Sequence, residues 1–211
     1  MLGKPLFALK SGIFPALLIV TCILAAGCAP VAYTTAGSGG QTAAEHYAAK
    51  GKPKVSVEDL ERRIHELINQ ERARYGLSSL AWNPTLNTIA RRHSQDMARR
   101  NYFGHYSPEG HDLAYRYSRQ GFVCEVDAGG WYLTGAENVF QNSLYDTVEY
   151  INEIPSTYHW TDLETIAAST VRGWMGSPGH RKNILEPAWR TEGIGIAISN
   201  DYKVTITQDF C

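Results

Sequence analysis

Apolar residues near the C-terminus alternate with other residues, and this period of two restricts the fold more than any other feature of the chain. The alternation covers residues 194–198 and 204–210, and the turn residues Asn200 and Asp201 stand between the two runs. Side chains at every second position lie on one face of a strand. The pattern therefore predicts a β-hairpin at the end of the chain.

Earlier segments carry apolar residues at helical spacing instead. The first predicted helix begins at Ser56 and ends at Gly76, and the second follows the Asn83-Pro84 start signal. The third has apolar residues on one stripe from 163 to 174, and we predict that Thr161 and Glu164 form its capping box. Helices followed by a terminal hairpin imply an α+β fold with an antiparallel sheet, covered by helices on one or both faces.

Three side chains in these helices could either bind a ligand or have a purely structural role. His65 lies off the apolar stripe of its helix, so we interpret it as a surface residue. His93 and Trp174 share apolar stripes with core residues. We interpret His93 as a hydrogen-bonded core histidine rather than a ligand, and Trp174 as part of the core.

The first 27 residues have the order of a secretory signal peptide. Lys4 and Lys10 precede an apolar run, and small residues lead directly to Cys28. The apolar run after Pro15 is too short for the roughly 20 residues of a transmembrane helix. The residues before Cys28 resemble the lipobox of bacterial lipoproteins, which implies cleavage before Cys28 and lipidation of its thiol. The alternatives are plain secretion with an incidental Cys28 and a membrane-spanning helix.

Lipid chains on Cys28 would anchor the protein to a membrane. Ala29 follows Cys28, whereas Asp at this position is associated with inner-membrane retention. We therefore expect the anchor in an outer membrane or on the extracellular face. Residues 28–55 are rich in small and polar residues and predict a flexible tether, and residues 56–211 predict a single folded domain.

Cys124 and Cys211 are the two cysteines left after the leader and the lipid site. Disulfides are common in exported proteins, so we expect these two residues to be bonded. Two free thiols are the alternative, because a sequence does not show whether two α-carbons lie within bridging distance. Neither cysteine has the spacing of a zinc-thiolate site.

The charge of the chain argues against a nucleic-acid partner. The chain has 20 basic and 21 acidic residues, and removal of the first 28 residues leaves 18 basic and 21 acidic residues, a net charge of −3. Residues 120–170 contain eight acidic residues and no lysine or arginine. This stretch would repel a phosphate backbone. We interpret it as a solvated acidic face, with a cation-attracting surface as the alternative.

Three strings rich in glycine, proline and polar residues stand between the periodic segments, where a scaffold displays functional residues on loops. They are GHYSPEG (104–110), GAENVF (135–140) and WMGSPGHRKNIL (174–185). With LSSLAWNPTL, RRHSQDM and the ending GIGIAI to QDF, they resemble the bacterial branch of the CAP superfamily. This superfamily contains cysteine-rich secretory proteins, insect antigen 5 and plant pathogenesis-related proteins. The resemblance implies an α-β-α sandwich with a three- or four-stranded antiparallel sheet between helical layers.

The resemblance also implies a cleft with two His and two Glu, which binds zinc or another divalent cation in some members. His105, Glu137 and His180 match three of these positions, but Ser177 stands where the second Glu is expected. Three ligands can hold zinc with one open position, whereas a Ser hydroxyl is a poor ligand and a poor base. The alternatives are a metal site, in which His159 or an Asp or Glu from elsewhere in the chain could substitute as a ligand, and a hydrogen-bonded structural cluster.

Ser177, Asn138 and His159 are the expected neighbours of this cleft. The string MGSPG lacks the first Gly of G-x-S-x-G, so no nucleophile elbow of a hydrolase is indicated. Spacing does not show whether the Ser177 hydroxyl and the His180 imidazole can meet, and no catalytic residue is assigned. The Pro-Gly pair before His180 predicts a turn that presents His180 at a loop edge.

Residues 141–160 form a longer connection than the bacterial relatives need, and they include several aromatic side chains. One interpretation is an aromatic lid over the cleft, suited to an apolar ligand or a glycan ring. The other, which we favour, is a short surface helix over 146–153 that packs Val148 and Ile151.

These features predict an exported, lipid-anchored CAP-domain protein that acts as a ligand-binding or interaction module in the cell envelope, with a lipid, a glycan or a protein as its ligand. One alternative is a divalent-metal-assisted hydrolase of peptide or envelope polymer, in which His105, Glu137 and His180 hold the cation and a water. Another is a purely structural envelope protein. The fold alone does not decide among these activities.

Overall fold

The computed structural model describes residues 51–211, so the predicted leader, Cys28 and most of the tether lie outside the described residues. Over residues 51–211, none of the helices has both the length and the apolar character needed to cross a bilayer. The elements are α2 (Val57–Arg74), β1 (Ala81–Trp82), α3 (Pro84–Arg100), α4 (Leu113–Arg119), β2 (Val126–Asp127), β3 (Tyr132–Leu133), β4 (Ala136–Ser143), β5 (Tyr145–Ile151), β6 (Ile154–Trp160), α5 (Leu163–Gly176), α6 (Pro178–Ile184), β7 (Thr191–Ile198) and β8 (Lys203–Phe210).

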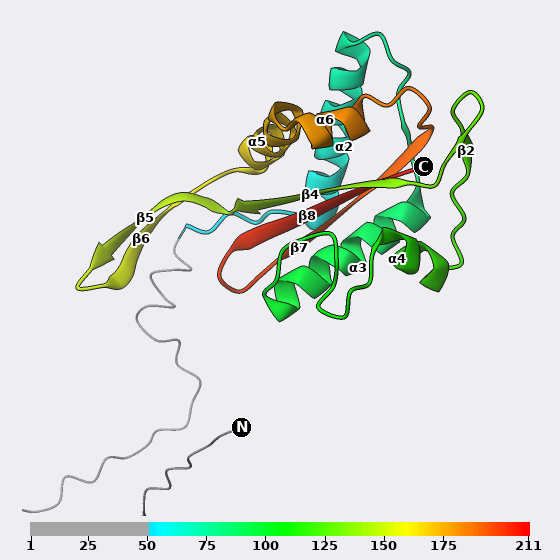
Figure 1. Cartoon of the computed structure of the whole chain (residues 1–211). Coiled ribbons are helices and arrows are strands. Elements are labelled where there is room, and N and C mark those ends of the chain that lie inside the picture. Colours follow the sequence, from blue (N-terminus) through cyan, green and yellow to red (C-terminus); the bar gives the residue numbers. More distant parts are fainter. Residues whose placement is uncertain (1–50) are drawn as a thin grey trace, which may run out of the picture. The chain divides into compact units, whose positions relative to one another are not determined.

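A four-stranded sheet lies between two layers of helices (Figure 1). Its strand order is β1-β7-β8-β4, in which β1 runs parallel to β7 and the other neighbours are antiparallel. Helices α3 and α4 lie on one face, and α2, α5 and α6 lie on the other. This arrangement confirms the predicted α-β-α sandwich and the C-terminal hairpin, whose strands are β7 and β8.

Side-chain caps determine where the long helices begin. Ser56 accepts a hydrogen bond from a backbone amide of the first turn of α2, and Asn83 accepts two from the first turn of α3, so both predicted starts are confirmed. The predicted capping box of Thr161 and Glu164 is wrong by one residue. Asp162 is the N-cap of α5, because its carboxylate is a stronger acceptor beside the positive end of the helix dipole.

Helix α3 packs directly on β7 because two glycines of the strand leave room for it. A Cβ atom added at Gly193 or Gly195 would overlap the backbone of α3. Side chains of the helices also form hydrogen bonds with backbone groups of β7 that the short strand β1 leaves unpaired. The amide of Asn87 donates to Ile194 O at 2.6 Å, and Glu61 accepts from Ile196 N at 3.0 Å.

We expect Gly195→Ala to lower the free energy of unfolding by about 3 kcal/mol, the upper end of the range for overpacked cores. The added methyl group cannot fit unless α3 moves away from β7. Urea unfolding of the variant and the wild type would measure the change. Gly179→Ala is the control, because a Cβ atom there has no neighbour within 4 Å and alanine favours a helix. Similar stability of the two variants would contradict this packing.

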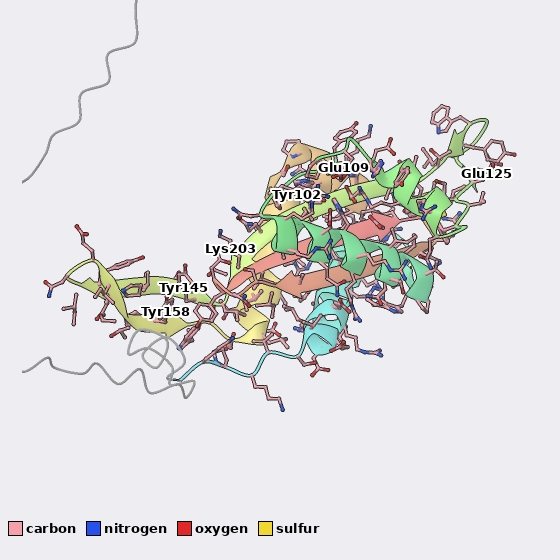
Figure 2. The ribbon with its side chains drawn as sticks, turned by 90° about the horizontal axis from the view of Figure 1, so that it is seen from below. Tyr102, Glu109, Glu125, Tyr145, Tyr158 and Lys203 are labelled. Atoms are coloured by element: carbon pink, nitrogen blue, oxygen red, sulfur yellow. A yellow bond between two sulfur atoms is a disulfide. The ribbon has the colours of Figure 1, made fainter. Side chains whose placement is uncertain are left out.

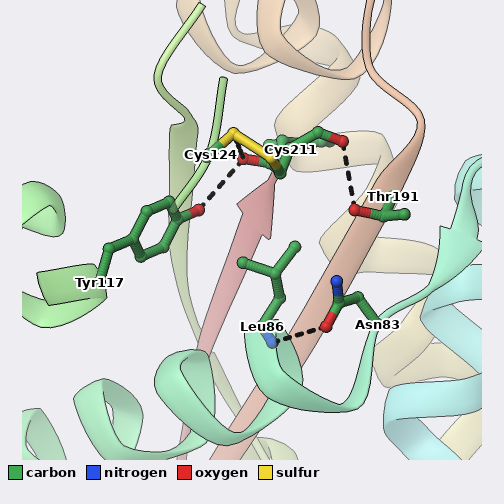
Figure 3. Close-up of a disulfide and its surroundings, with 7 residues drawn as sticks. Asn83, Leu86, Tyr117, Cys124, Thr191 and Cys211 are labelled. Atoms are coloured by element: carbon green, nitrogen blue, oxygen red, sulfur yellow. Dashed lines mark hydrogen bonds between the residues drawn. A yellow bond between two sulfur atoms is a disulfide. The ribbon is translucent and has the colours of Figure 1, made fainter. Parts of the chain in front are cut away.

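The predicted disulfide joins the segment after α4 to the end of β8. Cys124 and Cys211 are bonded, with their α-carbons 5.6 Å apart. The Tyr117 hydroxyl donates to Phe210 O at 3.1 Å, and the Thr191 hydroxyl donates to Cys211 O at 3.2 Å (Figure 3). The disulfide therefore holds the segment after α4 at the end of β8, and the two hydroxyl groups join α4 and β7 to the same end.

The connection between β4 and α5 is a second β-hairpin, so the predicted surface helix over 146–153 is wrong. Strands β5 and β6 pair in antiparallel register. Asn152 and Glu153 both have positive φ, 51° and 66°, which two-residue hairpin turns require. Aromatic and β-branched residues also favour the extended backbone on both sides of this turn.

The hairpin does not form the predicted lid either. It projects from the end of β4 at Ser143, whereas Glu137 is near the start of that strand (Figure 1). The base of the hairpin is an aromatic cluster of Tyr145, Tyr158 and Trp160 with Tyr202 from the turn between β7 and β8. Tyr145 and Tyr158 lie side by side where the hairpin leaves the domain (Figure 2).

Candidate functional site

The carboxylate of Glu137, near the start of β4, is bonded to side chains from two other segments. His105 Nδ1, from the loop after α3, donates to Glu137 Oε1 at 2.8 Å. The guanidinium of Arg116, on α4, forms an ion pair with Glu137 Oε2. His93 Nε2, on α3, lies 3.9 Å from Oε2 and donates to Gly104 O at 3.0 Å. The side chain of Glu137 is only 4% exposed, so these groups replace water around its charge.

Asp209 completes what we call the Glu137 cluster, which consists of His93, His105, Arg116, Glu137 and Asp209. Asp209 on β8 is the cross-strand partner of Glu137 on β4, so both side chains lie on the same face of the sheet. Asp209 is fully buried, and neither carboxyl oxygen accepts a hydrogen bond from a donor within residues 51–211. Burial, with a further contribution from the charge of Glu137, raises the pKa of Asp209 well above its ordinary value.

His105 and His180 lie close enough to influence each other. The hydrogen bond to Glu137 raises the pKa of His105. Burial lowers the pKa of His180, and the charge of His105 lowers it further. His105 therefore holds a proton more readily than His180 does. The predicted turn before His180 is wrong, because Pro178 is the first residue of α6, a position at which proline needs no amide hydrogen.

The three predicted neighbours of the cleft have different positions. Asn138 is fully buried and joins α6 to β4, since its amide donates to His180 O at 3.2 Å. Ser177 precedes α6, and its hydroxyl makes no hydrogen bond to His180 or to any other described residue. His159 lies on β6 and bonds to Glu149 at 2.9 Å, so it is not a substitute ligand. Of the residues predicted for the cleft, the structure brings together His105, Glu137 and His180, with Asn138 buried beside them.

The interpretation of His65 as a surface residue is wrong. Its Nδ1 donates at 2.5 Å to Glu192, whose side chain is fully buried. Glu192 also accepts a hydrogen bond from Gln208, and Gln208 accepts one from Asn138 at 3.0 Å. These residues form a polar chain across the sheet from α2 to β4, because a buried carboxylate needs donors wherever the fold provides them.

Sequence reasoning identified His93 correctly as a hydrogen-bonded core histidine, but it missed Arg116 and Asp209. Asp209 gave a weak signal, because a carboxyl group in a run of apolar, strand-forming residues is unusual. Nothing in the residues around Arg116 distinguishes it from the exposed arginines of the chain. Its role depends on the position of α4, which brings Arg116 to Glu137 on β4.

The Glu137 cluster does not fit a divalent cation. Residues 51–211 contain no group of three or more His, Cys, Asp or Glu side chains arranged to hold a metal ion. Both oxygens of Glu137 accept from nitrogen donors, and the charge of Arg116 would repel a cation approaching the carboxylate. The geometry therefore favours a hydrogen-bonded structural cluster over a metal site, the two alternatives that the sequence left open.

Asp209→Asn is expected to raise the free energy of unfolding by about 1–3 kcal/mol at pH 7, because it removes an ionisable group that is buried beside the charge of Glu137 and accepts no hydrogen bond. Asp209 keeps its proton in the folded state at pH values where the unfolded chain has lost it. The stability of the wild type therefore falls as the pH rises from 3.8, the ordinary pKa, to the raised pKa.

Urea unfolding at pH 4 and pH 7 would test this prediction, since the gain should shrink at the lower pH. Asp146→Asn is the matched control, because Asp146 is exposed and its replacement changes the net charge equally. A gain of the same size at both pH values would show that ionisation of Asp209 is not its cause.

The family and structural comparisons agree with the fold. The profile of the cysteine-rich secretory protein family, CAP, matches residues 65–210. The uncharacterized protein YkwD of Bacillus subtilis is 33% identical over 140 residues, which are 66% of this chain and 43% of YkwD. An extracellular protein of Bacillus anthracis that contains an SCP domain has a crystal structure with a TM-score of 0.52 and 26% identity, over 72% of this chain and 40% of that protein.

An outer surface protein of Borrelia burgdorferi shares the fold, with a TM-score of 0.54 at 14% identity, over 75% of this chain and 96% of that protein. The chain spans less than half the length of the two Bacillus proteins. The family profile covers more than half of the chain. The chain therefore belongs to the cysteine-rich secretory protein (CAP) family.

Proposed function

We propose that this protein is an exported, lipid-anchored CAP module that binds a ligand or a partner protein in the cell envelope. The signal-peptide-like N-terminus and the disulfide support export, and so does the similarity to an extracellular protein of Bacillus anthracis. The lipid anchor is inferred from the residues around Cys28.

The observation that carries the binding role is the ion pair between Arg116 and Glu137. Each oxygen of Glu137 already accepts a hydrogen bond, and the charge of Arg116 would repel a cation that approached this carboxylate. The side chain of His105 is half exposed, and the imidazole of His180 makes no hydrogen bond with residues 51–211. These two imidazoles offer hydrogen-bonding groups to a ligand, which supports recognition rather than hydrolysis.

Thermal unfolding of the full chain in detergent, with lipid extracts or peptidoglycan fragments, would test this proposal. A ligand present at about one hundred times its Kd should raise Tm by about 5–10 °C. The double variant His105→Ala/His180→Ala should lose this shift. His159→Ala should keep it, because His159 lies on the hairpin.

Zinc titration by calorimetry would separate the binding role from the hydrolase alternative. We expect no binding of zinc at micromolar concentration, and peptide and muropeptide substrates should stay intact. Turnover that a chelator abolishes, together with zinc binding that the double variant lacks, would favour the metal-assisted hydrolase and contradict the proposal.

A further inference from the structure

A pocket of about 400 Å³ lies between α3, the loop at 107–111 and the beginning of α4. Its lining includes His93 and Arg116 from the Glu137 cluster, but neither His105 nor His180. Tyr102 and Glu109 also line the pocket, and they lie on the same side of α3 (Figure 2). The volume is within the range of small-molecule binding sites.

The pocket has an excess of positive charge. Four arginines line it, at positions 92, 99, 100 and 116, together with two acidic residues, Asp96 and Glu109. Both acidic residues are already paired, Asp96 with Arg99 and Glu109 with Arg100. Arg92 bonds only to the neutral amide of Gln120 among the described residues, so its charge has no counterion there. An anionic group on a ligand would supply one.

A flat aromatic surface and further polar groups stand beside this charge. The rings of His111 and Tyr115 stack with centroids 3.6 Å apart, and Tyr115 is 40% exposed. A sugar ring or an aromatic ring could pack on such a surface. Gln95 also lines the pocket with an exposed side chain, and the oxygen of its amide can accept a hydrogen bond. An acceptor in the pocket favours a ring that carries hydroxyl groups.

We propose that this pocket binds a sugar that carries a carboxylate, with the carboxylate on Arg92 and the sugar ring against Tyr115. A carboxylated sugar in a cell envelope can come from two sources, a uronic-acid polysaccharide or the muramic acid of peptidoglycan. The pocket shares no exposed residue with the His105 and His180 surface. It can therefore bind its ligand whether or not that surface binds one.

Calorimetric titration of the full chain in detergent would test the proposal with two pairs of sugars. The pairs are galacturonic acid with galactose, and N-acetylmuramic acid with N-acetylglucosamine. At least one acidic sugar should bind, and its neutral counterpart should bind about tenfold more weakly or worse, because it lacks the charge-assisted hydrogen bond. The acidic sugar that binds identifies the source.

Variants of exposed residues keep the test independent of folding. Arg92→Ala and Tyr115→Ala should each weaken binding by about tenfold. Arg119→Ala and Tyr150→Ala are the matched controls, since both residues are exposed and lie outside the pocket, and binding should not change. His180→Ala should also leave the affinity unchanged, which separates this proposal from the function proposed above.

Four results would overturn the proposal. One is the absence of binding by both acidic sugars, and another is equal binding of the acidic and neutral sugars. The third is an equal loss of affinity in Arg92→Ala and Arg119→Ala. The fourth is no loss of affinity in Arg92→Ala and Tyr115→Ala.

Discussion

Removal of the disulfide by Cys124→Ala/Cys211→Ala is expected to lower the free energy of unfolding by about 4–5 kcal/mol in the chain-entropy model. The bond joins residues 87 positions apart, so it restricts much of the domain in the unfolded state. It also holds the segment after α4 against the end of β8, where Tyr117 bonds to Phe210 O. Most domains of this size are stable by only about 5–15 kcal/mol, so the loss is a large fraction.

Urea unfolding of the double variant and the oxidised wild type would measure this loss. The reduced wild type is the internal control, because it breaks the same bond without changing the sequence, and it should lose a similar amount. A double variant that unfolds within about 1 kcal/mol of the oxidised protein would contradict the stabilising role.

Arg116→Met is expected to lower the free energy of unfolding by about 3–5 kcal/mol, because it leaves a buried carboxylate without its cation. Arg116 and Glu137 are 12% and 4% exposed at their side chains, so water can replace little of the lost interaction. Arg116 also donates to His105 O and His111 O, which connects α4 to the loop before it. The substitution removes these bonds as well.

A double-mutant cycle with Glu137→Gln would isolate the ion pair from the other contacts of Arg116. The double variant should be more stable than the sum of the two single losses predicts, because a neutral amide tolerates the absence of the guanidinium. Arg119→Met is the matched control on the same helix, at an exposed position, and we expect it to change stability by less than about 0.5 kcal/mol. Additive losses in the cycle would contradict a direct pairing of Arg116 with Glu137.

The hairpin at 145–160 shows where sequence reasoning failed and why. Val148 and Ile151 stand three residues apart, a spacing that fits one face of a helix. The same segment contains aromatic and β-branched residues that favour a strand, and short runs of this kind do not distinguish the two. Its turn depends on Asn152 and Glu153 taking positive φ, and its base depends on contacts with Tyr202, which is distant along the chain.

Only part of the candidate site was predictable from the sequence. His105, Glu137 and His180 were found from motifs, and the structure places them around the edge of the sheet formed by β4. Arg116 was not found, although its bond to Glu137 is the strongest argument against a cation site at this carboxylate. Motifs show which residues a family uses, but not which charges surround them in one protein.

The sequence by itself determined the elements whose signals are local. These are the capped helices α2 and α3 and the strands β7 and β8, and short motifs also indicated the family of the domain. Only the tertiary structure decided the electrostatics of the site. The pairing of β4 with β8 places Asp209 opposite Glu137, and the packing of α4 brings Arg116 to the same carboxylate. The physical reason is that a period of two or 3.6 residues depends on neighbours along the chain, whereas the charge around a buried group depends on segments that meet only after folding.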